Sequence, residues 1–197
     1  MGHPSRKSHS RAKRAGARSR GRRPARTLGL IVAALAVAGV LAVRARSGSE
    51  GPRIHLYQGQ ATLGSTTVSL DSLLGKGRPV VVNFWASNCP PCREEMPAFQ
   101  RVYAAHGDEG YLMIGVDVGP QTGLGTHQGA QALIRRLGIR YPVGYAEGNA
   151  LVVRYGLRGM PTTLFFDASG HLSSRVVGYL DEARFRGKLA ALLASAN

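Results

Sequence analysis

Apolar residues beyond residue 52 fall into short runs that polar or glycine-rich segments separate. The runs at residues 80–85 and 111–118 are continuous, apolar and rich in β-branched residues, as expected for buried strands. Two further short runs, at residues 162–166 and 172–177, flank a turn that ends in glycine and predict a β-hairpin.

Segments with a helical pattern alternate with these strands. We expect helices at four places along the chain: residues 90–106, 128–137, 149–155 and 181–194. The last of them is amphipathic and begins with Asp181 and Glu182, where the helix dipole favours acidic side chains. With the short third helix set aside, the order βαβαββα predicts an α/β fold whose mixed central sheet is flanked by helices on both faces.

An uncharged apolar run at residues 27–43, bounded by Arg26 and Arg44, precedes this domain. As a helix it would be roughly 25 Å long, the short limit for a hydrocarbon layer of about 30 Å, and flanking arginines can snorkel to cover the difference. The pattern favours a retained single-pass signal-anchor over the core of a cleaved signal peptide, although residues 40–42 offer small side chains at cleavage offsets. Either way the following residues are exported, to remain at the cell membrane or to be secreted.

The net charge of +15 is concentrated at the N-terminus. Residues 1–26 hold ten basic residues and no acidic one, which predicts a disordered tail that the positive-inside bias keeps in the cytoplasm. Residues 44–52 resemble a flexible linker, and residues 53–197 form the predicted folded domain. Nucleic-acid binding is not expected, because the apolar run directly follows the tail and no aromatic residue interleaves with its charges.

Cysteine usage excludes two common kinds of site. The chain has only Cys89 and Cys92, whereas a disulfide scaffold needs more cysteines spread along the sequence. A tetrahedral zinc site would need two further ligands at suitable spacing, and the six histidines are scattered. We therefore expect no metal ion and no cofactor.

The two cysteines lie in the segment W-A-S-N-C-P-P-C at residues 85–92, where a predicted strand meets a predicted helix. At a helix N-terminus, free N–H groups and the helix dipole stabilise the Cys89 thiolate, which is the nucleophile in disulfide exchange. Cys92 follows one helical turn later and can form a disulfide with Cys89. A disulfide that closes so small a loop would stabilise the fold little, which favours a redox role over a structural one.

A second segment of interest, G-M-P-T-T at residues 159–163, opens a predicted buried strand. Pro161 is a candidate cis-proline, and Met160 could then offer its backbone N–H and C=O to an extended substrate. An ordinary trans proline at a strand start is the alternative, and spacing alone does not decide between them.

Taken together, W-x-x-x-C-P-P-C, Pro97 and G-M-P-T-T resemble the thioredoxin superfamily over about residues 60–195. Residues 80–86 and the following C-R-E-E-M-P at 92–97 are more closely similar to the TlpA/ResA-like extracytoplasmic reductases, which include the cytochrome-c-biogenesis thioredoxins. The resemblance implies a thioredoxin fold.

The same resemblance implies roles for individual residues. Cys89 would be the attacking thiol and Cys92 the resolving one. Met160, the cis-proline Pro161 and Trp85, which would pack near the disulfide, would form the substrate-binding residues. Pro97 would kink the active-site helix.

The sequence departs from this family in its acidic residues. Asn83 stands where cytosolic thioredoxins keep a buried Asp that assists proton transfer. ResA-type members place a Glu after the second strand, where this chain has only Asp117 nearby, and Asp117 has the position of a strand-terminating or N-capping residue. Glu94 and Glu95 lie early in a helix, and we interpret them as structural or surface residues. The proton acceptor is therefore not identified.

We expect a thiol–disulfide oxidoreductase that reduces disulfides of exported proteins, with apocytochrome c as a candidate substrate and a membrane protein as electron donor. The main alternative is an oxidant of the same fold, because the Pro-Pro dipeptide does not fix the redox potential. A thiol peroxidase would want a threonine at the position of Ala86, and a Cu(I)-binding redoxin would favour a histidine near Cys92; the chain has neither.

Overall fold

The computed structural model describes residues 51–107 and 110–195. The predictions for the basic tail, the apolar run at residues 27–43 and most of the linker lie outside these residues. Within the described ranges, no helix combines the length and apolar character that crossing a membrane requires.

The centre of the domain is a seven-stranded mixed sheet in the order β2-β1-β5-β4-β3-β6-β7. Its strands are β1 (Arg53–Gln58), β2 (Thr67–Ser69), β3 (Val80–Trp85), β4 (Leu112–Asp117), β5 (Val143–Ala146), β6 (Thr162–Phe166) and β7 (Leu172–Val177). β4 runs parallel to both β3 and β5, whereas the other neighbours pair antiparallel. The predicted mixed sheet and the β6–β7 hairpin are confirmed.

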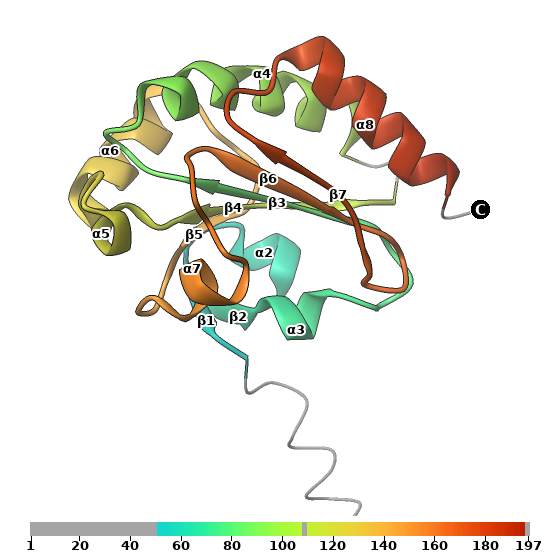
Figure 1. The fold of residues 1–197 in the computed structure, drawn as a ribbon, viewed down its shortest axis with the longest axis horizontal. Helices are drawn as coiled ribbons and strands as arrows, with labels where there is room; N and C mark the ends of the chain where they lie inside the picture. Colours follow the sequence, from blue (N-terminus) through green and yellow to red (C-terminus); the bar gives the residue numbers. More distant parts are fainter. Residues whose placement is uncertain (1–50, 108–109, 196–197) are drawn as a thin grey trace, which may run out of the picture. The chain divides into compact units, whose positions relative to one another are not determined.

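Helices cover both faces of the sheet, as Figure 1 shows. Their bounds are α2 (Gln60–Leu63), α3 (Leu70–Leu73), α4 (Pro90–His106), α5 (Gly119–Thr122), α6 (His127–Arg136), α7 (Ala150–Arg154) and α8 (Glu182–Ala194). In Figure 1, α4, α6 and α8 lie over one face, and α2, α3 and α7 lie over the other. The predicted α/β arrangement with two covered faces is thus confirmed.

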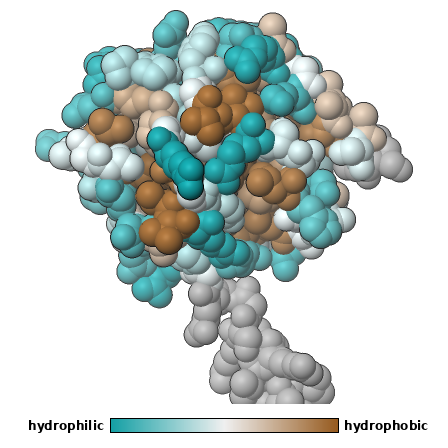
Figure 2. All heavy atoms as spheres, in the orientation of Figure 1, coloured by the Kyte–Doolittle hydropathy of each residue, from teal (hydrophilic) through white to brown (hydrophobic). Residues whose placement is uncertain are grey.

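The alternation of side chains along β3 divides the core into two clusters. Val81 and Trp85 pack toward α4, α6 and α8, whereas Val80, Val82 and Phe84 pack toward α3 and α7. All five are fully buried. On the outer surface, Figure 2 shows brown apolar patches that teal hydrophilic side chains separate.

Three strands and three short helices were not predicted from the sequence. β1 is mostly half-buried and lacks a continuous apolar run, β2 has only three residues, and β5 has only four, one of them a glycine. The short helices α2, α3 and α5 have four residues each, too few to show a helical period.

Candidate active site

The cysteine pair lies where β3 ends and α4 begins. Cys89 is the N-cap of α4 and Pro90 and Pro91 occupy the first turn, where missing N–H groups cost nothing. The Cys89 Sγ atom accepts a hydrogen bond from the Cys92 N–H at 3.3 Å and is joined to Cys92 Sγ in a disulfide. In the reduced protein, the same N–H and the helix dipole would stabilise a Cys89 thiolate.

Of the two cysteines, only Cys89 reaches the surface. Cys89 is 4% exposed and contributes to the lining of a groove of about 390 Å³, which we call the active-site groove. Cys92 is 0% exposed and does not line it. The groove is formed by residues 88–91, Thr122, Leu124 and residues 157–160. A substrate disulfide in this groove therefore meets Cys89 first.

Met160 lies in the groove, and its peptide bond to Pro161 is cis, which confirms the candidate cis-proline. The Pro161 carbonyl accepts a hydrogen bond from the Gly178 N–H at 2.8 Å, and the Gly159 carbonyl accepts one from the Thr162 hydroxyl at 2.7 Å. Among the described residues, none forms a hydrogen bond with the Met160 backbone. This N–H and C=O are thus available to an extended chain, as strand addition requires.

Trp85 is fully buried in the same hydrophobic cluster as both cysteines. This position agrees with the expected packing near the disulfide. Trp85 does not line the active-site groove, so its predicted contact with substrate remains a prediction.

Glu95 is a buried carboxyl whose importance the sequence interpretation missed. It is 0% exposed and lies one helical turn after Cys92. Its Oε1 accepts a hydrogen bond from Asn83 Nδ2 at 2.8 Å, and its Oε2 accepts one from the Leu180 N–H at 3.1 Å. Burial raises the pKa of the Glu95 carboxyl to about 8, although both hydrogen bonds oppose the shift.

Helical phase could have identified Glu95. Cys92, Glu95, Met96 and Phe99 are all buried and recur with the spacing of one helix face, whereas Glu94 is exposed. On β3, Asn83 stands where cytosolic thioredoxins keep a buried Asp. In this chain the buried carboxyl is instead on α4, and it accepts a hydrogen bond from Asn83. Glu95 shares the buried face of α4 with Cys92, one turn away, which makes it a candidate to exchange a proton with that thiol.

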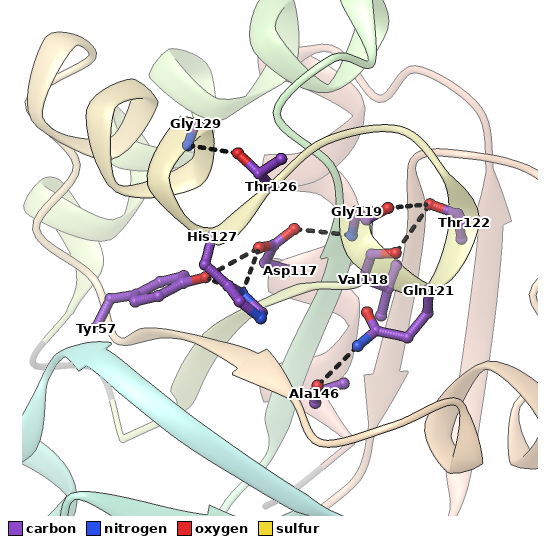
Figure 3. Close-up of polar contacts among 10 residues, drawn as sticks. All are labelled: Tyr57, Asp117, Val118, Gly119, Gln121, Thr122, Thr126, His127, Gly129 and Ala146. Atoms are coloured by element: carbon purple, nitrogen blue, oxygen red, sulfur yellow. Dashed lines mark hydrogen bonds and ion pairs between the residues drawn. The ribbon is translucent and has the colours of Figure 1, made fainter.

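Asp117, itself fully buried, anchors a second polar cluster, shown in Figure 3. Its Oδ1 accepts a hydrogen bond from the Gly119 N–H at 2.8 Å, and its Oδ2 accepts one from the Tyr57 hydroxyl at 3.1 Å. His127 Nδ1 lies 2.8 Å from the Tyr57 oxygen, so when the hydroxyl proton goes to Asp117, the imidazole donates to Tyr57. Burial raises the pKa of Asp117, which these hydrogen bonds oppose.

This cluster supports one wall of the active-site groove. The segment after Asp117 contains Thr122 and Leu124, which line the groove. The Leu124 carbonyl accepts a hydrogen bond from the Asn88 N–H at 2.7 Å, next to Cys89. Asp117 therefore ends its strand, as expected, and also positions the groove wall.

We predict that Tyr57→Phe lowers the free energy of unfolding by about 1–3 kcal/mol, because it removes the hydroxyl donor of buried Asp117 Oδ2 and leaves that oxygen only the more distant His127 Nδ1, at 3.8 Å. Denaturant unfolding measures this loss. Tyr145→Phe is the matched control, since within the described residues the Tyr145 ring stacks on its neighbours but its hydroxyl forms no hydrogen bond. Equal stability of the Tyr57→Phe variant and the parent protein would contradict the assigned role of the hydroxyl.

Comparisons with known proteins agree with this site. The AhpC/TSA family model matches residues 48–175. The chain is 32% identical over 144 residues to the thiol-disulfide oxidoreductase ResA of Oceanobacillus iheyensis, covering 73% of this chain and 71% of the relative. It is 30% identical over 151 residues to the thiol:disulfide interchange protein HelX of Rhodobacter capsulatus, covering 76% and 78%.

Solved structures show the same fold. A thioredoxin-family thiol:disulfide interchange protein from Chlorobium tepidum superposes with a TM-score of 0.55 at 28% identity, over 74% of this chain and 97% of that one. The exposed lipoprotein thioredoxin Etrx1 of Streptococcus pneumoniae superposes with a TM-score of 0.58 at 23% identity, over 71% and 98%. The predicted thioredoxin fold is therefore confirmed.

Proposed function

The chain belongs to the AhpC/TSA family and is a thioredoxin-like thiol–disulfide oxidoreductase, and on this basis we propose that it reduces disulfides of exported proteins through Cys89. The observation that carries this proposal is the unequal placement of the two cysteines. Cys89 caps a helix at the floor of a groove, and Cys92 lies buried directly behind it.

Two exchange steps complete the reaction. The Cys89 thiolate attacks one sulfur of the substrate disulfide, which forms a mixed disulfide and releases the other substrate sulfur as a thiolate. Cys92 then loses its proton to Glu95 and attacks Cys89 Sγ, which releases the second substrate thiol. The protein ends as the Cys89–Cys92 disulfide, and the substrate has gained two electrons and two protons, one that Glu95 passes on from Cys92 and one from solvent.

The export part of the proposal rests on the sequence. We infer that residues 27–43 anchor the chain in the membrane, with the basic tail in the cytoplasm and the catalytic domain outside. In an oxidising compartment the disulfide needs a dedicated electron donor, which we propose is a membrane protein. The resemblance to the cytochrome-c-biogenesis thioredoxins makes apocytochrome c a candidate substrate.

Membership of the AhpC/TSA family raises the alternative of a thiol peroxidase, but the site does not favour it. Ala86 is buried and offers no hydroxyl where a peroxidase would want a threonine. Cys92, which forms a disulfide with Cys89 three residues before it, and the groove beside Met160 are instead suited to exchange with a peptide disulfide.

Redox potential decides between a reductant and an oxidant. We expect the Cys89–Cys92 pair to equilibrate near the value of thioredoxin, about −270 mV, rather than near the strongly oxidising value of DsbA, about −120 mV. The protein is equilibrated in dithiothreitol and glutathione redox buffers and then alkylated. Mass spectrometry gives the fraction of reduced protein in each buffer, from which the potential follows. A value near the DsbA end would replace the proposed reductant with an oxidant of the same fold.

A further inference from the structure

Arg158 is the only charged residue among those that line the active-site groove. Its side chain is exposed, and it forms no ion pair or hydrogen bond with any residue that the structure describes. The other lining residues are cysteine, proline, apolar residues or uncharged polar ones. Arg158 therefore places a positive charge without an acidic partner directly in the lining of the groove.

Neighbouring arginines are engaged in the fold and are not available in the same way. Arg154, four residues before Arg158, forms a bidentate pair with Asp71, with N–O distances of 2.6 and 2.7 Å. Arg93, which does not line the groove, donates to the Ser87 carbonyl at 2.6 Å and to Asn88 Oδ1 at 3.3 Å, and thus holds the loop before Cys89. Arg158 has no comparable structural contact among the described residues.

The backbone around Arg158 defines where its charge would meet a substrate. Met160, two residues later, has a free backbone N–H and C=O beside Cys89. Residues 159–161 bend before β6 begins at Thr162, and both Arg158 and Met160 line the groove. Because Cys89, Arg158 and Met160 line the same groove, a substrate that pairs with Met160 and places its cysteine at Cys89 would bring residues close to that cysteine near the Arg158 guanidinium.

Apolar surface continues from the groove on the side of Pro161. Gly178 hydrogen-bonds to Pro161, and its neighbours Val177 and Tyr179 are 56% and 40% exposed. This surface can bind apolar side chains of an extended peptide, but it discriminates little between sequences. Selection among substrates by their charge therefore depends on Arg158.

We propose that Arg158 is a specificity residue, which pairs with an acidic side chain within about two residues of the substrate's reactive cysteine. The preferred substrate class is thus an extended, apolar polypeptide segment with Asp or Glu beside its disulfide, and a Lys or Arg at that position is disfavoured by repulsion. This inference rests on the proposed exchange reaction at Cys89 and deepens it.

The test uses three peptides that differ only in Glu, Gln or Lys two residues after a single cysteine, which is carried as a neutral 2-pyridyl disulfide. The reduced full-length chain is mixed with each peptide, and release of pyridine-2-thione gives the second-order rate constant. We expect the Glu peptide to react about three- to tenfold faster than the Lys peptide at low ionic strength, and this ratio to shrink toward one in 1 M NaCl.

Variants locate the source of the preference. Arg158→Glu is expected to reverse the order of the peptides, and Arg158→Gln to bring the three rates within about twofold of one another. Arg136→Gln is the matched control, because Arg136 is exposed, forms no ion pair within the described residues and does not line the groove. That variant should keep the order of the parent protein.

The outcomes separate this inference from the proposed function. Equal rates for all three peptides, or an unchanged order in Arg158→Gln, overturn the role of Arg158 while the reaction at Cys89 stands. Failure of every peptide to react, or reaction that persists unchanged in Cys89→Ser, overturns the proposed function itself.

Discussion

Replacing Cys89 with serine is expected to reduce disulfide-exchange activity by about a thousandfold or more. A serine hydroxyl cannot supply the thiolate that the N-terminus of α4 stabilises, and Cys92 lies buried behind the groove. Insulin reduction with dithiothreitol as electron source measures this loss. An activity of Cys89→Ser close to that of the parent protein would show that the groove-facing sulfur is not the nucleophile.

Cys92→Ser is the companion variant, and its expected behaviour is different. Cys89 can still attack, but the serine hydroxyl cannot resolve the intermediate, so the mixed disulfide with substrate should accumulate. Mass spectrometry of the adduct, and its disappearance on reduction, detect this species. Accumulation of a mixed disulfide in Cys89→Ser instead would exchange the roles of the two cysteines.

Glu95→Gln is expected to slow exchange by about a hundredfold near pH 8, because the variant cannot accept the proton of Cys92. The pKa of Glu95 is raised to about 8 by burial, so the carboxyl becomes an effective base only as the pH approaches that value. The ratio of parent to variant rates should therefore rise with pH and level off above about 8.

A second measurement on the same variant follows from linkage. The folded-state pKa of Glu95, about 8, exceeds its ordinary value of 4.5, so between these pH values the native state binds more protons than the unfolded state. Stability contributed by the protonated carboxyl is therefore present at low pH and lost as pH rises through this interval, at up to about 1.4 kcal/mol per pH unit. Glu95→Gln should remove this pH dependence of the free energy of unfolding, whether the substitution raises or lowers stability at any single pH.

Glu94→Gln provides the matched control for both measurements. Glu94 precedes Glu95 on α4 but is exposed, so its neutralisation should leave the rate ratio and the pH dependence of unfolding close to those of the parent. If Glu95→Gln behaved like Glu94→Gln, the buried carboxyl would have no part in proton transfer.

Continuous apolar runs made much of the fold predictable from the sequence. β3 and β4 are buried on both faces and contain no polar interruption that would obscure them, apart from Asn83. The start of α4 was predicted to the residue, because Pro90 and Pro91 follow a cysteine at a strand end. The hairpin of β6 and β7 followed from a turn with glycine between two apolar runs.

Features that depend on distant residues were not predictable in this way. β1 became a sheet strand through its pairing with β5, about 90 residues later in the chain, and neither strand has a strong local pattern. Beyond the local Gly119 N–H, the contacts of Asp117 come from Tyr57 on β1 and from His127 on α6. Glu95 is different, since its burial follows from helical phase relative to Cys92, and only its partner Leu180 is remote.

The hydrogen bond between Asn88 and Leu124 has a mechanical consequence for substrate selection. It ties the backbone next to the nucleophile to the loop that forms the opposite wall, and Asp117 fixes the origin of that loop to β4. A rigid, folded surface that spread the groove open would therefore also pull Cys89 away from its helix N-terminus and weaken its own attack. We therefore expect a thin unfolded chain, which leaves the Asn88–Leu124 hydrogen bond in place, to be the better substrate.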